Sequence, residues 1–421
     1  MSTAKTIVLA ALVAAFARPP AWAQVDAREQ SPAVAGAELQ RTVPLRVAVE
    51  AAWQRAVAVR ESEGQRKRAE AGQVAASSYW AAPPSLELAL RNDRLMTDAG
   101  ERETTLGVAW PLLLPGQRTA RAKLADGDVA LADDALAAAR LRLAGEVREA
   151  AWSLAEHRAE VALAEATVKT LEAVANDVDR RVRAGDLARV DALAARAEWL
   201  NATTQRSEVQ QRWLAARSRW TTLTGLDALP AIDLEPVGPV PVDPLAAHPD
   251  MRLAYASSEQ ARRKLDLLRS SRRDAPELTM GVRQDIPSRG EAANYSLLVG
   301  LRVPFGPDDR NRPLETAALG ELDTAETLQA RTRDRVGADI ALARERSQQA
   351  ERQLEAERER ASLLRERALL IDKSFRAGES SLPELLRALS AASQAEAALA
   401  RQQAALGLAR ARFNQSLGLL P

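Results

Sequence analysis

Few residues of this 421-residue chain could carry chemistry, because it contains no cysteine and only two histidines. His157 and His248 are far apart in sequence, and neither has a neighbour at a spacing typical of metal ligands. No glycine-rich phosphate loop precedes a helix, and no Ser–His–Asp arrangement can be read. The 58 lysines and arginines are interspersed with 57 acids, which favours a solvated, salt-bridged surface over a nucleic-acid-binding patch. The sequence therefore predicts no enzyme, no cofactor or metal site and no nucleic-acid partner.

The first residues are typical of a secretory signal. Lys5 precedes an apolar run over 7–17, and residues 21–23 form a small-x-small cleavage site. The alternative is an uncleaved membrane anchor, but a helix needs about 20 apolar residues to span a bilayer. We therefore expect a signal peptide over 1–23 and an irregular N-terminal arm over 24–44.

The rest of the chain contains an internal duplication, because several landmarks recur with one offset. The pairs Pro111 and Pro304, Gly185 and Gly378, and Gly225 and Gly418 are each 193 residues apart. This predicts two repeats, at 45–226 and 248–421, joined by a proline-rich connector at 227–247.

Each repeat is predicted to contain a pair of very long helices. No proline lies between Pro115 and Pro230 or between Pro313 and Pro383, and both stretches are rich in strong helix formers. A helix over 115–185 would be roughly 100 Å long at about 1.5 Å per residue. A soluble coiled-coil rod would contain similar helices, so they do not identify the compartment.

Between the helices of each repeat, period-two alternation predicts a β-hairpin, at about 85–111 and 277–304. Apolar residues alternate with small, polar or charged ones, which include Arg91, Arg283 and Arg302. A half-buried soluble hairpin would alternate in the same way. The signal for export, strands of about 8–10 residues and aromatic residues at one end favour strands that cross an outer membrane.

Four membrane strands would need partners from other copies of the chain. A membrane barrel needs at least about eight strands, and an open strand edge leaves backbone groups unpaired in lipid. Two copies would supply eight strands, and three copies would supply twelve.

The chain resembles the TolC-like outer-membrane efflux proteins. The resemblance rests on the signal peptide, the duplication, the paired hairpins entered at prolines, and the glycine turns at 183–187 and 376–380. It implies a mainly α protein with two membrane β-hairpins, in which the duplicated helix–hairpin–helix unit forms a trimeric α-barrel plus a 12-stranded β-barrel. Arg91, Arg283 and Arg302 would then line the barrel lumen.

The resemblance also implies a function and partners. The chain would be the outer-membrane channel subunit of a tripartite efflux system, with a periplasmic helical portion. It would be a homotrimer in contact with outer-membrane lipid and a passive conduit for substrates. An inner-membrane pump would deliver these through a periplasmic adaptor protein, and the compact length is in keeping with the heavy-metal efflux branch. The alternative is a soluble periplasmic coiled-coil adaptor or structural protein, which would not be expected to carry two such hairpins.

By resemblance, the adaptor contacts the glycine turns at the tips of the helix pairs. The tip residues are Arg183, Ala184, Gly185, Asp186 and Leu187 in the first repeat, and Arg376, Ala377, Gly378, Glu379 and Ser380 in the second. From the residues alone, each glycine could end a helix with a positive φ, so plain helix–helix turns are the simpler interpretation.

The family narrows its tunnel with an acid six residues after the turn glycine, which corresponds to Asp191 and Glu384. A second family acid, nine residues after the glycine of the second repeat, is replaced by Arg387 here, and this weakens the expectation of strong cation selectivity. The alternative is that Asp191 and Glu384 are first-turn acids that complement a helix dipole.

Overall fold

The computed structural model describes residues 42–95, 99–232, 234–305 and 308–421. The predicted signal peptide at 1–23 and most of the predicted arm, residues 24–41, lie outside this part. The first described element, β1 (Thr42–Val43), pairs in parallel with β4 (Leu229–Pro230) of the connector. The start of the described chain is thereby joined to the segment between the two repeats.

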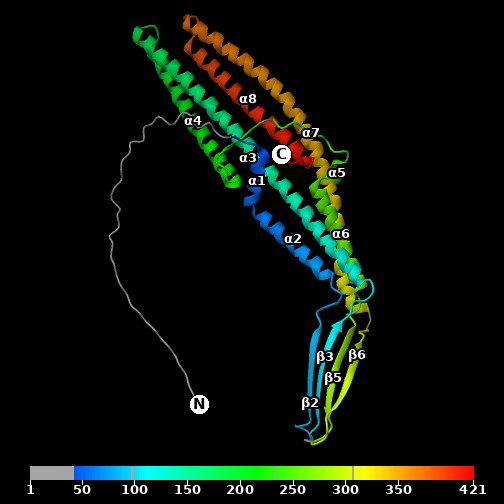
Figure 1. Ribbon diagram of the computed structural model, residues 1–421. Helices are drawn as coiled ribbons and strands as arrows, with labels where there is room; N and C mark the ends of the chain where they lie inside the picture. Colours follow the sequence, from blue (N-terminus) through cyan, green and yellow to red (C-terminus); the bar gives the residue numbers. More distant parts are fainter. Residues whose placement is uncertain (1–41, 96–98, 233, 306–307) are drawn as a thin grey trace, which may run out of the picture. The chain divides into compact units, whose positions relative to one another are not determined.

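The described elements form two successive sets with the same order (Figure 1). The first set is α1 (Leu45–Arg55), α2 (Val57–Ala76), β2 (Ser85–Asn92), β3 (Arg102–Pro111), α3 (Gln117–Ala184) and α4 (Arg189–Thr224). The second is α5 (Pro244–Ala247), α6 (Pro249–Ser270), β5 (Glu277–Ile286), β6 (Asn294–Arg302), the short 3-10 helix η1 (Asp308–Asn311), α7 (Arg312–Arg376) and α8 (Leu382–Ser416).

The helices pack side by side, with α3 in contact with helices of both sets. Near its N-terminal end, α3 packs against α2 and α6, and further along it packs against α4 and α8. Helix α7 packs first against α6 and then against α8. Among the described residues, none of the helices has a stretch long and apolar enough to span a membrane.

Small residues allow these helices to approach closely. Trp220 of α4 is fully buried in a cluster that includes Ala48 and Ala144, and its indole N–H donates to the carbonyl oxygen of Ala228 at 3.0 Å. Gly407 of α8 leaves space for the ring of Trp152 on α3, because a Cβ atom at position 407 would lie 2.0 Å from that ring. The alanine-rich composition thus reflects close helix packing as well as helix propensity.

A buried arginine fastens the connector to both repeats. Arg148 of α3, 2% exposed, donates to both carboxylate oxygens of Glu235 at 3.1 and 3.0 Å. It also donates to Gln415 Oε1 at 2.7 Å and to the carbonyl oxygen of Leu419 at 2.9 Å. Asn414 Nδ2 donates to the same Glu235 carboxylate at 3.1 Å. These bonds offset the large cost of burying the guanidinium.

The two hairpins form one four-stranded sheet in the order β2-β3-β5-β6, in which every neighbouring pair is antiparallel. The start of β5, Glu277, lies 192 residues after the start of β2, Ser85, rather than 193. The one-residue difference keeps the leucine and valine positions of both hairpins on the same face, because a slip of one residue would reverse every side chain.

Candidate functional site

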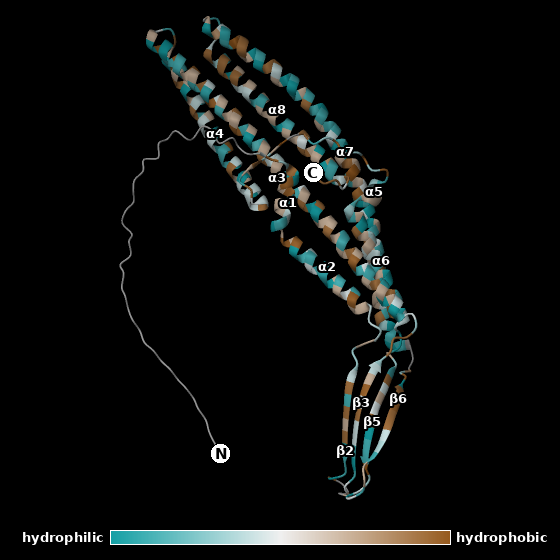
Figure 2. Ribbon diagram, viewed as in Figure 1, coloured by the Kyte–Doolittle hydropathy of each residue, from teal (hydrophilic) through white to brown (hydrophobic). Residues whose placement is uncertain are grey.

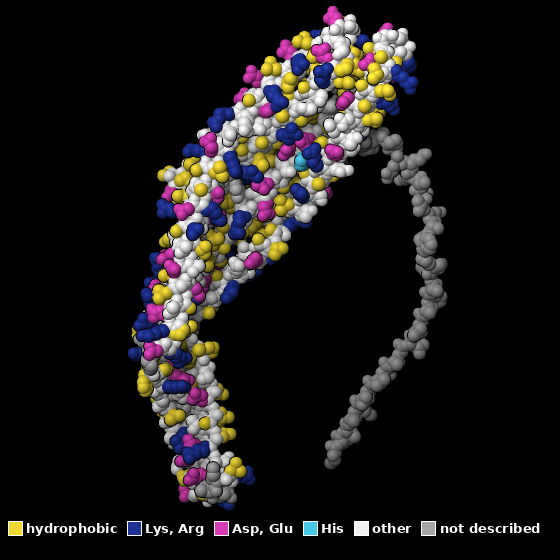
Figure 3. Space-filling model, turned by 180° about the vertical axis from the view of Figure 1, so that it is seen from behind, with side chains coloured by type: hydrophobic (Ala, Val, Ile, Leu, Met, Phe, Trp, Pro, Cys, Tyr) yellow, Lys and Arg dark blue, Asp and Glu magenta, His cyan; other side chains and the backbone are white. Residues whose placement is uncertain are grey.

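The strands of the four-stranded sheet contain both hydrophobic and hydrophilic residues (Figure 2). Their pairing register places the large apolar side chains on one face, which is uncovered. Nine of its large side chains are between 43% and 72% exposed: Leu86, Leu88, Leu90, Leu106, Met280, Val282, Leu297, Val299 and Leu301. So many exposed apolar side chains on one face are rare on soluble monomers and mark a contact with a membrane or another protein. Figure 3 shows yellow side chains projecting along the sheet, whereas the helices carry interspersed acids and bases.

Aromatic residues lie near both ends of this sheet. Trp80 forms an isolated bridge with Leu112 just beyond the β2–β3 pair, and Phe305, 95% exposed, follows β6 at the same end. At the opposite end, Tyr295 is paired with Gln284 and is 72% exposed. Aromatic side chains at the two limits of an apolar band are typical of strands that cross a bilayer.

The opposite face carries most of the charged residues of the strands, including the three predicted lumen arginines. Arg283 contacts Glu103 at 3.0 Å, and Arg91 lies 3.9 Å from the same carboxylate. Arg302 lies 3.8 Å from Glu277. The structure therefore brings Arg91, Arg283 and Arg302 to one face, opposite the apolar one, where each has a carboxylate within reach.

Two glycines face each other at the centre of this polar face. Gly107 of β3 is paired with Gly281 of β5, and a Cβ atom on Gly281 would lie 2.5 Å from the carbonyl oxygen of Leu106. The two hairpins can therefore approach closely at this point only without a side chain at position 281. Small residues on one face also permit a sheet to curve toward that face.

The two predicted helix–helix turns have the same backbone hydrogen bonds. At the end of α3, Gly185 has φ +91°, its N–H donates to Val182 O at 3.1 Å, and Asp186 N–H donates to Arg181 O at 2.9 Å. At the end of α7, Gly378 has φ +79°, and the equivalent bonds reach Phe375 O at 3.1 Å and Ser374 O at 2.9 Å. Both turns are Schellman motifs, which need the left-handed residue that glycine supplies.

Most predicted tip residues are exposed. Arg183, Ala184, Gly185, Asp186, Arg376, Ala377, Gly378 and Glu379 are exposed, whereas Leu187 and Ser380 are partly buried. Directly beneath the turns, Val178, Ala195, Phe375, Leu382 and Leu385 form a buried cluster that joins the two helix pairs. Arg181 strengthens this junction, since its guanidinium lies over the Phe375 ring at 5.1 Å. The turns are thus brought to one end of the helical part and held on a common apolar base.

The gate candidates occupy the first turns of the returning helices. Asp191 is the first-turn acid of α4, and Glu384 is the first-turn acid of α8. Within the described part of the chain, neither carboxylate makes an ion pair. Arg387 is exposed, and its Nε donates to the carbonyl oxygen of Pro383 at 3.1 Å. Both acids are therefore placed to complement a helix dipole. Because neither is held in an ion pair, their positions are also compatible with lining a water-filled tunnel.

The histidines have structural partners. His157 Nδ1 lies 3.1 Å from Glu160 Oε2, and Arg212 of α4 and Arg401 of α8 approach the same carboxylate at 3.8 and 3.5 Å. His248 Nδ1 accepts the backbone N–H of Asp250 at 3.1 Å and so caps α6. Sequence reasoning missed both roles; the signal available for the second was Pro249-Asp250, typical of a helix start. In the described ranges, no three His, Cys, Asp or Glu residues are grouped as metal ligands.

Sequence comparison relates part of the chain to a known family. Residues 48–226 match the family model of outer membrane efflux proteins. The cobalt-zinc-cadmium resistance protein CzcC of Cupriavidus metallidurans is 28% identical over 252 residues, which is 58% of each chain. The match thus spans little more than half the length of this curated relative.

Three solved structures share the fold, and their descriptions name transmembrane channel formation, an outer membrane protein and an outer membrane channel. The structure of CusC, described in terms of transmembrane channel formation, has a TM-score of 0.75 at 15% identity and covers 90% of this chain and 93% of its own. The outer-membrane protein VceC from Vibrio cholerae has a TM-score of 0.71 at 15% identity, covering 89% and 96%. The MtrE outer membrane channel of Neisseria gonorrhoeae has a TM-score of 0.70 at 17% identity, covering 89% of both chains.

These comparisons confirm the predicted resemblance and the mainly helical fold with its four-stranded sheet. The family is one of efflux proteins rather than enzymes. No comparison tests the residues predicted for the tips, the gate or the lumen, which stay predictions.

Proposed function

We propose that this chain is the outer-membrane channel subunit of a tripartite efflux system. It would act as a passive conduit across the periplasm and the outer membrane for substrates that an inner-membrane pump delivers. The observation that carries the proposal is the uncovered apolar sheet face with aromatic residues at both ends. Such a face costs free energy in water and is stabilised by lipid.

The same sheet supports assembly with further copies. Its outer strands, β2 and β6, each pair on one side only within the described chain. In lipid an unpaired strand edge would leave several backbone N–H and C=O groups without hydrogen bonds. Three copies of the four-stranded sheet would supply twelve strands, and pairing of β6 with β2 of the next copy would leave no free edge.

The helices offer a matching surface for other copies. Exposed leucines on α7 are separated by multiples of seven: Leu314, Leu328, Leu342, Leu363 and Leu370. On α4, Leu193, Leu200 and Leu214 are also exposed and follow the same spacing. A seven-residue repeat of apolar residues is the pattern by which helices supercoil around a partner helix. We infer that α7 of one copy packs against α4 of the next. Together with the twelve strands that three copies supply, this contact supports a homotrimer.

The position of the glycine turns supports a contact with an adaptor, and the name of a relative supports the choice of cargo. The exposed Schellman turns at Gly185 and Gly378 are the farthest part of the helix pairs from the sheet, as expected for the contact with a periplasmic adaptor (Figure 1). The name of CzcC refers to cobalt, zinc and cadmium, so we propose divalent metal cations as the cargo. The lumen enclosed by the twelve strands would be lined by Arg91, Arg283 and Arg302.

A soluble periplasmic adaptor or structural protein is the competing function. The helices alone would suit it, but nine exposed apolar side chains on one sheet face would promote aggregation in water. The alternative would require another protein to cover that face.

Fractionation of cells that express the tagged protein tests the proposal. We expect the protein in the outer-membrane fraction, and unboiled gel samples should run near three times the mass of the boiled chain. The physical reason is that a closed set of strands resists dissociation in detergent. A monomer that stays in the soluble periplasmic fraction would rule out the channel.

The gate assignment predicts an effect on conductance. Lysine in place of Glu384 should lower the cation conductance of single channels by about twofold or more, because acidic rings attract cations at a constriction. The matched control is Glu208→Lys, which reverses an exposed acid midway along α4. If Glu384→Lys conducts like the control, Glu384 is a helix-dipole acid only.

A further inference from the structure

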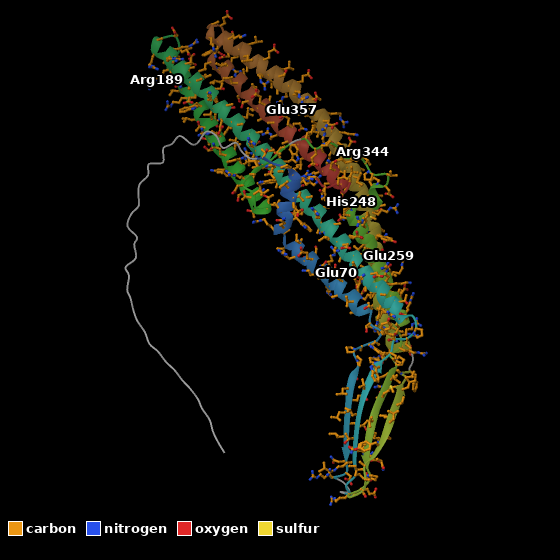
Figure 4. The ribbon with its side chains drawn as sticks, in the orientation of Figure 1. Glu70, Arg189, His248, Glu259, Arg344 and Glu357 are labelled. Atoms are coloured by element: carbon orange, nitrogen blue, oxygen red, sulfur yellow. The ribbon has the colours of Figure 1, made fainter. Side chains whose placement is uncertain are left out.

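A cavity of about 550 Å³ lies where α6 begins and α8 ends, with α3 and α7 as its other walls. Figure 4 labels His248 at this junction, at the start of α6. None of the residues predicted for the tips, the gate or the lumen borders the cavity, although Leu342 of the proposed contact between copies does.

The lining of this cavity is positively charged. Four arginines and two aspartates border it: Arg142, Arg335, Arg346, Arg412, Asp250 and Asp339. Arg335 contacts Asp250 at 3.4 Å, and Arg412 contacts Glu149 at 2.9 Å. In contrast, Arg142 and Arg346 make no ion pair within the described ranges. The cavity therefore presents two guanidinium groups without a carboxylate partner.

A buried donor adds to these charges. His248 is 5% exposed and lines the cavity, and its Nδ1 accepts the Asp250 N–H at 3.1 Å. In the neutral ring the proton must then be on Nε2, which makes no hydrogen bond within the described part of the chain. Burial lowers the pKa of His248, which keeps the ring in this neutral form.

Helix α6, which His248 caps, adds to the positive charge around the cavity. α6 has 22 residues, and its N-terminal end borders the cavity through His248 and Asp250. Aligned peptide dipoles give such an end a partial positive charge, which favours anions. Asp250 and Asp339 oppose an anion, but Asp250 is paired with Arg335, and Arg142 and Arg346 together outnumber the remaining Asp339.

We propose that this cavity is a binding site for a small oxyanion, a phosphate or carboxylate group free in the surrounding solution. The guanidinium groups of Arg142 and Arg346 would bind its oxygens, and the Nε2–H of His248 would donate a third hydrogen bond. Guanidinium groups suit this task because their planar N–H pairs match the oxygens of carboxylate and phosphate. The site does not depend on the channel proposal.

Calorimetric titration of the full-length, detergent-solubilised protein tests the site. Inorganic phosphate and acetate are the probes, each at constant ionic strength with chloride as the reference anion. We expect saturable binding of at least one probe. The double variant Arg142→Gln/Arg346→Gln should weaken it at least about tenfold, because two charge-assisted contacts are removed.

The matched control is Arg344→Gln, which removes an exposed arginine of α7 that does not border the cavity (Figure 4). It should bind the probe as the unaltered protein does. No saturable binding of either probe, or an equal loss in the control, would overturn the proposal. A protein that binds phosphate but fractionates as a soluble monomer would keep this site and remove the channel.

Discussion

Arginine in place of Met280 is expected to keep most of the protein out of the outer membrane. Met280 lies in the middle of β5, between Val108 and Val299 on the neighbouring strands, and is 43% exposed on the apolar face. A charged side chain on the lipid face near the bilayer midplane costs about 2–4 kcal/mol. In a trimer this cost would occur once per copy. Cell fractionation with unboiled gel samples measures the loss of inserted, heat-resistant protein.

The neighbouring residue provides the control. Thr279 lies on the opposite face of β5, between Ala109 and Gly300, so Thr279→Arg adds the same charge at the same depth but away from the apolar face. We expect this variant to insert normally, because the polar face already carries Arg91, Arg283 and Arg302 with their carboxylates. Normal insertion of both variants would mean that the apolar face does not contact lipid.

Much of this architecture could be predicted because its signals are periodic and local. Period-two alternation indicated the strands, and their bounds, Ser85–Asn92 and Glu277–Ile286 among them, agree closely with that pattern. The glycines at 185 and 378 marked the turns because a Schellman motif needs a residue with positive φ. Pairing of β3 with β5 could not be predicted, since alternation shows which face a residue takes but not which strand lies beside it.

The contacts that the sequence did not reveal join distant residues through single side chains. Arg148 and Glu235 are 87 residues apart, and nothing in the charged, salt-bridged sequence of α3 distinguishes this arginine from its exposed neighbours. The cavity at His248 depends on where α6 begins relative to the end of α8, which the repeat pattern does not specify. On α7, buried Leu354, Ala361 and Ala368 are spaced by seven, as the exposed leucines are. Spacing alone therefore could not identify which residues of α7 are exposed.

Tryptophan in place of Ala377 is expected to abolish efflux while leaving assembly intact. Ala377 is exposed beside the second glycine turn and has φ −79°, so a large side chain there does not strain the backbone. Gly378 is a poorer choice, because at φ +79° any side chain is strained by about 1 kcal/mol or more. A bulky ring on the tip would separate the turn from the adaptor, and contacts between proteins require close complementarity.

Growth of cells on inhibitory metal or drug concentrations measures efflux, and unboiled gel samples measure assembly. The matched control is Ala330→Trp, which adds the same ring to an exposed position in the first half of α7, far along the helix from the turn. If the adaptor contacts the turn, only Ala377→Trp becomes sensitive, and it still forms heat-resistant oligomers. Sensitivity in both variants would indicate a general defect of the helices. Resistance in both would show that the turn bears no essential contact, which would leave the Schellman motif as a helix–helix connection alone.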